Sequence, residues 1–173
     1  MMKTLLYTLF LGLVIFNGTA FAASEGSDST TLDWRKTALE AKKTNRPVIL
    51  VFESDGCPYC ERLKKSVLTP MLREGELDDL ALVGAFDIGT GGKIKDFDGE
   101  KVRARRFVSR YNVFATPTVV IVDAHGRELA DPIVGFDDPD TYRERLAKAL
   151  QASRALLTRP VVKSNAVARV HTR

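Results

Sequence analysis

The sequence predicts an α/β domain in which helices flank a central sheet. Apolar runs rich in β-branched residues, at positions 47–52 and 118–122, are typical of strands buried on both faces of a sheet. Amphipathic segments alternate with these runs, as expected for helices that cover a sheet. The chain has 173 residues, and about 150 of them follow a leader-like N-terminus, which suits one domain with a single core. The pattern contains neither internal repeats nor a second domain.

Residues 1–22 have the three parts of a secretory signal. Lys3 supplies the positive start, residues 5–16 are almost entirely apolar, and Ala20 and Ala22 form an Ala-x-Ala cleavage motif. The apolar stretch is shorter than the roughly 20 residues that a membrane-spanning helix needs. We therefore expect a cleaved signal peptide and a periplasmic protein, with an uncleaved membrane anchor as the alternative.

The charge pattern of the rest of the chain favours no nucleic-acid partner. The net charge is only +4, and acidic residues are interleaved with the basic ones. Residues 23–32 are small and polar, so we expect a flexible lead-in to a domain at 33–157. Residues 158–173 contain bases and no acid, which predicts a basic, disordered tail.

The first part of the domain predicts a helix, a strand and a second helix. Asp33 or Thr31 is suited to cap the first helix, because a short polar side chain can accept hydrogen bonds from the free amides of the first turn. The apolar strand at 47–52 follows, and a polar turn leads to a helix at 57–68. Pro70 is expected to bend that helix or to begin another.

The second part of the domain predicts two more strand regions and two more helices. Apolar residues at Ala104, Phe107 and Tyr111 have helical spacing, and Asp138 with Pro139 is a typical helix start. In order, we expect a strand at 80–88, a glycine-rich loop at 89–100, a helix at 102–111, a strand at 118–122, a turn at 123–126, a hairpin partner at 127–134 and a long helix at 138–157. His125 falls in the turn and is not expected to be a metal ligand.

Cys57 and Cys60 are the only cysteines of the chain. A bridge between them encloses so few residues that it adds little stability, which argues against a purely structural disulfide. At a helix N-terminus, the free amides and the helix dipole favour the thiolate of Cys57, whereas Cys60 lies a turn further inside. The pattern therefore indicates a redox-active pair that needs no other cofactor, with Cys57 as the attacking sulfur and Cys60 as the resolving one.

The chain resembles the thioredoxin superfamily in two motifs, Cys57-Pro58-Tyr59-Cys60 and Ala115-Thr116-Pro117-Thr118. The resemblance implies a thioredoxin fold, with a central mixed sheet, an N-terminal helix and a long C-terminal helix. It also implies that Pro117 is cis beside the disulfide and that Thr116 presents its backbone to a partner polypeptide. Pro58, Tyr59 and Gly135 are then expected to border the substrate groove. Several turns and helix starts are similar to those of exported thioredoxin-like proteins of the SoxW type.

The chain departs from thioredoxin at the proton acceptor of the second cysteine. Thioredoxin carries a buried acid six residues before its first cysteine, and this chain has Val51 there. Glu53 or Asp55 is the possible substitute, although both are equally compatible with a solvated turn.

The sequence thus predicts a periplasmic thiol-disulfide oxidoreductase whose substrates are protein thiols and disulfides. We expect it to reduce disulfides and to draw electrons from a membrane donor, because an oxidising compartment offers no soluble reducing pool. The Pro-Tyr pair matches that of glutaredoxins, which suggests a potential near about −200 mV. The alternatives are an oxidant or isomerase of the same fold, a Cu(I)-handling protein that uses both thiolates, and a redox-inert binding module.

Overall fold

The computed structural model describes residues 33–159. The predicted signal peptide, the lead-in up to residue 32 and the tail from residue 160 lie outside the described residues. Within the described part, no helix combines the length and the apolar character that crossing a membrane requires. The helical segments are α1 (Trp34–Thr44), α2 (Pro58–Leu63), the π-helical η1 (Lys64–Leu68), α3 (Thr69–Arg73), α4 (Ala104–Arg110) and α5 (Pro139–Thr158). The strands are β1 (Val48–Glu53), β2 (Leu82–Asp87), β3 (Lys93–Lys95), β4 (Lys101–Arg103), β5 (Thr118–Val122) and β6 (Ile133–Val134).

The main sheet is mixed and has the order β2-β1-β5-β6. Strand β1 runs parallel to β2 and antiparallel to β5, and β5 is antiparallel to β6. All residues of β1 except Glu53 are buried, as expected for a strand covered on both faces. The predicted central mixed sheet between helices is confirmed.

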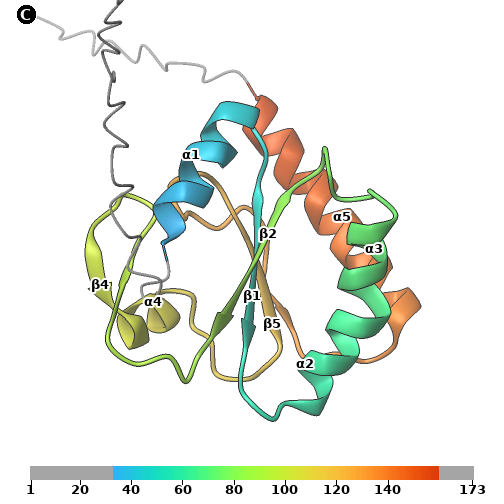
Figure 1. Cartoon of the computed structure of the whole chain (residues 1–173). Helices are drawn as coiled ribbons and strands as arrows, with labels where there is room; N and C mark the ends of the chain where they lie inside the picture. The colour runs from blue at the N-terminus through green and yellow to red at the C-terminus, as the bar shows by residue number, and fades with distance from the viewer. Residues whose placement is uncertain (1–32, 160–173) are drawn as a thin grey trace, which may run out of the picture.

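The alternation of side chains along β1 divides the interior into two cores. Ile49 and Val51 face one core, which includes apolar residues of α2, η1 and α5. Val48, Leu50 and Phe52 face the other, which includes residues of α1 and α4. Figure 1 shows α2, α3 and α5 on one side of the sheet and α1 and α4 on the other.

The helix caps agree with their predicted starts. Asp33 caps α1 and accepts a hydrogen bond from the backbone N–H of Arg35, so Asp33 and not Thr31 marks that start. Asp138 caps α5 and accepts from the N–H of Thr141, with Pro139 as the first helical residue. Helix α5 ends at Thr158, one residue beyond the expected domain end.

The helix after the cysteines continues past Pro70 without a break. The N–H of Thr69 donates to the carbonyl of Lys64, five residues back, which is the wide turn of a π-helix. Pro70 then occupies the second position of α3, where a missing N–H costs little. Of the two expected outcomes, a bend or the start of another helix, the structure shows the second: Pro70 lies in the first turn of α3, which follows the π turn without a gap.

The glycine-rich segment at 89–100 is not a plain loop as expected. It contains β3, which forms a hairpin with β4 in the register Lys93↔Arg103, Ile94↔Val102 and Lys95↔Lys101. Ile94 and Phe97 are 1% and 5% exposed and pack into the core that contains Trp34, and Val102 packs against that core, so burial of these apolar side chains holds the hairpin on the domain. Because β4 uses residues 101–103, helix α4 starts at Ala104 instead of position 102.

The hairpin partner expected at 127–134 is much shorter in the structure. It consists of β6 and one isolated bridge between Val122 and Glu128. Pro132 precedes β6 and has no N–H to donate to a sheet, which limits pairing at this edge. The strand therefore pairs with β5 only beside Thr118 and Val119.

Candidate active site

Cys57 lies where the chain leaves the central strand and enters a helix. A short turn follows β1, with Gly56 in the left-handed conformation at φ +64°. Cys57 is the N-cap of α2, in an extended conformation, and Pro58 is the first helical residue. The strand, turn and proline thus place the sulfur of Cys57 at the N-terminus of a helix, where backbone N–H groups have no hydrogen-bond partner within the helix.

The two cysteines form a disulfide, with their Cα atoms 5.3 Å apart. Cys57 is partly exposed, whereas Cys60 is only 2% exposed. The backbone N–H of Cys60 donates to Sγ of Cys57 at 3.2 Å. The more accessible sulfur therefore also receives an amide hydrogen bond, which is stronger when the acceptor carries a negative charge.

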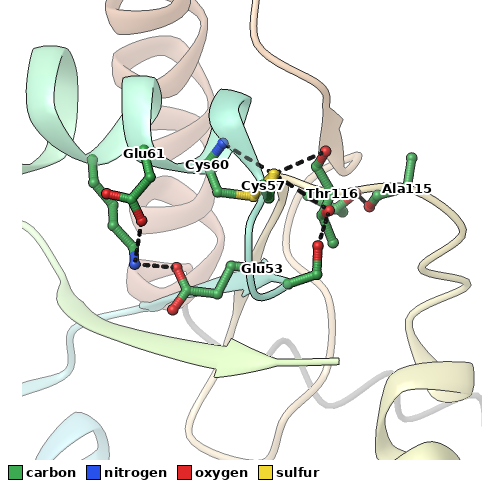
Figure 2. The surroundings of a disulfide bond; sticks show 9 residues. Glu53, Cys57, Cys60, Glu61, Ala115 and Thr116 are labelled. Atoms are coloured by element: carbon green, nitrogen blue, oxygen red, sulfur yellow. Dashed lines mark hydrogen bonds and ion pairs between the residues drawn. A yellow bond between two sulfur atoms is a disulfide. The ribbon is translucent and has the colours of Figure 1, made fainter. Parts of the chain in front are cut away.

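Thr116 contacts Sγ of Cys57 on the side away from the backbone N–H of Cys60, as Figure 2 shows. The Thr116–Pro117 peptide bond is cis, the isomer that the resemblance implies. The carbonyl oxygen of Thr116 lies 3.7 Å from Sγ of Cys57, and the hydroxyl oxygen of Thr116 lies 3.6 Å from it. The Thr116 hydroxyl also shares a hydrogen bond of 2.8 Å with the hydroxyl of Ser54. Ser54 was not singled out from the sequence, because its role depends on a contact across 62 positions.

Gly135 lies next to the cis-proline. Its N–H donates to the carbonyl of Pro117 at 2.8 Å, which extends the pairing of β5 and β6 by one bond. Gly135 has φ +79°, so a side chain at this position would be strained even though the space around it is open. The structure thus brings Gly135, Pro117 and the disulfide together at one end of the sheet, as the resemblance implies.

An exposed surface of aromatic and cationic side chains flanks the disulfide. Pro58 is exposed, and Tyr59 is 53% exposed. The guanidinium of Arg62 lies 5.7 Å from the ring centroid of Tyr59 and 5.4 Å from that of Phe136, so its planar cation bridges the two rings. Phe114, two residues before Thr116, is 84% exposed. Arg62, Phe114 and Phe136 could not be identified from the sequence, since nothing in their local pattern distinguishes them from ordinary surface or core residues.

The two acids considered as proton acceptors lie in different surroundings. Glu53 is the last residue of β1, and its carboxylate forms an ion pair of 2.6 Å with Nζ of Lys64. Figure 2 draws this ion pair as a dashed line from the Glu53 carboxylate. The hydrogen bond to Glu53 raises the pKa of Lys64, against the opposing effect of burial. Asp55 is exposed in the turn.

The fully buried acids of residues 33–159, Asp96 and Asp123, are engaged away from the disulfide. Val51 is 1% exposed in the core, so the position where thioredoxin carries its acid is fully apolar. Asp96 pairs with Arg110 in the region of the β3–β4 hairpin, and Asp123 pairs with Arg127 after β5. Because β5 is antiparallel to β1, Asp123 lies at the edge of the sheet opposite the disulfide.

The described residues contain no cluster of three or more potential metal ligands. His125 is an exposed turn residue, as predicted, and its backbone N–H donates to Asp123. The sulfurs of Cys57 and Cys60 are bonded to each other.

Comparison with known proteins identifies related domains. A model of the thioredoxin-like domain matches residues 34–150. The thiol:disulfide interchange protein DsbD of Ralstonia nicotianae is 27% identical over 115 residues, which are 66% of this chain and 17% of DsbD. DsbD 1 of Pseudomonas aeruginosa is 28% identical over 111 residues, which are 64% of this chain and again 17% of the relative. This chain therefore spans about a sixth of the length of these curated relatives.

The structural comparison supports the same fold. The solution structure of a thioredoxin from Thermus thermophilus matches with a TM-score of 0.50 and 24% identity, over 69% of this chain and 82% of that one. The match with the family model covers most of the chain and includes both cysteines and the cis-proline. The chain therefore belongs to the thioredoxin-like family of the thioredoxin superfamily.

Proposed function

We propose that this protein is an exported thiol-disulfide oxidoreductase that reduces disulfides of other proteins through Cys57 and Cys60. One observation carries the proposal: a partly exposed sulfur at a helix N-terminus lies against the backbone of Thr116, with its disulfide partner buried beneath it. This arrangement leaves one sulfur open to a substrate and keeps the other within bonding distance of the first.

In the reductive direction, the Cys57 thiolate attacks one sulfur of the substrate disulfide. A mixed disulfide forms, and the first substrate sulfur leaves as a thiolate. The Cys60 thiolate then attacks Sγ of Cys57, which restores the Cys57–Cys60 disulfide and releases the second substrate thiolate. Two electrons pass from the protein to the substrate, and both released thiolates can take protons from water.

The surroundings of Cys57 support its role as the attacking sulfur. The amide of Cys60 and the hydroxyl of Thr116 are directed at Sγ of Cys57, and both can stabilise negative charge on it. The carbonyl of Thr116 lies beside the sulfur, where an extended substrate segment can pair with the backbone of Thr116. Tyr59 and Phe114 provide exposed apolar area on which such a segment can pack.

The proton of Cys60 has no buried carboxylate as acceptor in this proposal. Val51 is apolar, so the proton passes to the carboxylate of Glu53, which Lys64 holds in an ion pair, or to water that reaches the turn. Of the two acids, Glu53 is favoured, because its side chain is only 19% exposed whereas Asp55 is exposed.

The location and the electron donor belong to the same proposal. Residues 1–22 predict export to the periplasm, and the curated relatives are named as thiol:disulfide interchange proteins. An exported reductase needs a donor that brings electrons across the membrane, so we propose a membrane protein thiol pair as the partner that reduces the Cys57–Cys60 disulfide. The SoxW subgroup stays a prediction.

A trapping experiment tests the function. In a Cys60→Ser variant the mixed disulfide on Cys57 cannot be resolved, so partner proteins should remain covalently attached in periplasmic extracts and be released by dithiothreitol. The Cys57→Ser variant is the matched control and should trap nothing. A redox titration of the wild-type protein should give an intermediate potential near about −200 mV.

Two results would contradict the proposal. A potential near about −120 mV, together with faster oxidation of reduced substrates than reduction of oxidised ones, would indicate an oxidant. Copper that is retained in stoichiometric amount after dialysis and lost in Cys57→Ser would indicate metal handling.

A further inference from the structure

Three of the residues that line a hollow beside the β3–β4 hairpin are cationic. The hollow has a volume of about 420 Å³ and is lined by the glycine-rich residues 90–92 together with Lys93, Arg103, Ala104 and Arg105. A Cβ atom added at Gly91 or Gly92 would meet no atom within 4 Å, so the glycine side of the hollow is open. The volume lies within the range of ordinary ligand sites.

The cations of this hollow are not neutralised by the domain itself. Lys93 and Arg103 are direct partners across the β3–β4 ladder, where two like charges oppose each other and destabilise the pair. Lys93, Arg103 and Arg105 form no ion pair with any side chain of residues 33–159, whereas the neighbouring Lys95 pairs with Asp33. An anionic group that contacts these exposed cations would relieve this repulsion.

The hollow and the disulfide lie at the same edge of the sheet. Strands β1 and β2 are parallel neighbours, so the turn that leads to Cys57 and the segment that leads to Gly91 leave the sheet together. The N–H of Ile88 donates to the carbonyl of Glu53 at 2.8 Å, which joins the starts of the two segments. Figure 1 shows both connections at the end of the sheet where α2 begins.

We propose that Lys93, Arg103 and Arg105 bind an acidic segment of the polypeptide whose disulfide reacts with Cys57. This inference rests on the proposed function and names the chemistry of the partner. All three cations are exposed, so each contact with a carboxylate is weak in water, and a lone small anion would gain little. A polypeptide already held at Thr116 presents its acidic residues at high local concentration, and several weak contacts then act together.

The proposal predicts a charge-dependent rate. Opposite charges on the two partners speed their encounter, and salt screens this effect. Reduced protein should therefore react faster with a substrate that carries acidic residues beside its disulfide. At low ionic strength we expect an advantage of about tenfold over a neutral substrate, and this advantage should shrink as salt is added.

The test uses three synthetic peptides with the same disulfide loop and a glutamate-rich, glutamine-rich or lysine-rich flank. The measured quantity is the second-order rate constant of their reduction by the full mature protein. Lys93→Glu, Arg103→Glu and Arg105→Glu together should abolish the preference for the acidic peptide and favour the basic one. The corresponding triple glutamine variant, which only removes charge, should bring the acidic and neutral rates together.

Lys42→Glu, Lys43→Glu and Lys148→Glu form the matched control, because these exposed lysines give the same change in net charge. Lys42 and Lys43 lie in the last turn of α1, at the opposite edge of the sheet. The control variant should keep most of the acidic preference. Circular dichroism and the unchanged rate with the neutral peptide would show that every variant is folded and redox-active.

The proposal is overturned if the wild-type protein reduces the three peptides at equal rates, or if the control variant loses as much preference as the triple reversal. It is also overturned if inorganic phosphate, at constant ionic strength, competes as well as an acidic peptide without a disulfide, since the hollow would then be a site for small anions. Failure of the proposed function has a different signature, because no peptide would be reduced at all.

Discussion

Val51 occupies the position where thioredoxin carries a buried acid, and its apolar surroundings predict that an acid introduced there would destabilise this domain. Val51 is 1% exposed, in the middle of β1, and its strand neighbours are Ala85 and Val119. It belongs to the core that includes Leu63 from α2. A Val51→Asp substitution keeps the approximate size of the side chain but places a carboxyl group among apolar atoms.

The cost of this substitution follows from two terms. Burial of a valine side chain contributes roughly 1.5 to 2 kcal/mol, which is lost. Burial of a polar group without a partner costs about 1 to 3 kcal/mol more. Val51→Asp should therefore lower the free energy of unfolding by about 3 to 5 kcal/mol, a large part of the roughly 5 to 15 kcal/mol of an ordinary domain.

The loss should grow with pH. Burial raises the pKa of the introduced carboxyl group, so above about pH 4 the unfolded chain releases a proton that the folded chain retains. The unfolded state then binds fewer protons, and stability falls by up to about 1.4 kcal/mol per pH unit until the folded form also ionises.

Urea unfolding of the wild type, Val51→Asp and Val51→Asn at acidic, neutral and alkaline pH measures this effect. Val51→Asn is the matched control, because it is polar but does not titrate. We expect Val51→Asp to fall increasingly below Val51→Asn as the pH rises. If Val51→Asp is as stable as the wild type at alkaline pH, the interior below the disulfide accepts a charge, and the reasoning about the missing acid is wrong.

Three further predictions follow from single contacts. A Cβ atom added at Gly84 would lie 2.6 Å from the ring of Trp34, the single tryptophan of the chain. Gly84→Ala should therefore destabilise the domain by about 1 to 3 kcal/mol and shift the fluorescence emission of Trp34. Unchanged thermal unfolding and unchanged emission would refute the contact. Burial acts to raise the pKa of Asp123, but hydrogen bonds from the amide and guanidinium of Arg127 outweigh burial and hold this pKa below 3.8. Asp123→Asn should therefore lower the free energy of unfolding by about 1 to 3 kcal/mol at neutral pH. This difference from the wild type should vanish as the pH falls through the lowered pKa of Asp123. A difference in urea unfolding that does not depend on pH would contradict this prediction. Thr116→Val removes the hydroxyl that lies 3.6 Å from Sγ of Cys57. Alkylation of reduced Cys57 should then slow several-fold, while the free energy of unfolding should change by less than about 1 kcal/mol. An unchanged alkylation rate would exclude a role for this hydroxyl.

Much of the site could be predicted because its parts are local in the sequence. Cys57 and Cys60 are three positions apart, and a helix that starts at the first cysteine necessarily places the second one a turn inside. The continuous apolar run before them predicts the buried strand β1, since a strand with one solvated face would alternate with polar residues. The caps Asp33 and Asp138 act within three residues of their own positions.

The parts that could not be predicted depend on contacts between distant segments. The hairpin of β3 and β4 forms because Ile94 packs into the core that contains Trp34. The polar residues of the segment 89–100, taken alone, favour a loop. The hydrogen bond between Ser54 and Thr116 and the position of Arg62 between Tyr59 and Phe136 likewise join residues from separate elements. The π turn before Pro70 is a compromise between continuing a packed helix and tolerating a residue without an N–H.

The sequence by itself determined which residues carry the chemistry, because a thiol pair and its helix start are defined by chain neighbours. The tertiary structure alone decided what surrounds that pair: the hydroxyl pair of Ser54 and Thr116 beside the open sulfur, and, at the same edge of the sheet, cations that form no ion pair within residues 33–159. The physical reason is that the sheet order β2-β1-β5-β6 brings strand ends from three distant parts of the chain to one edge, and the short-range patterns of hydrophobicity and turn residues do not encode that order.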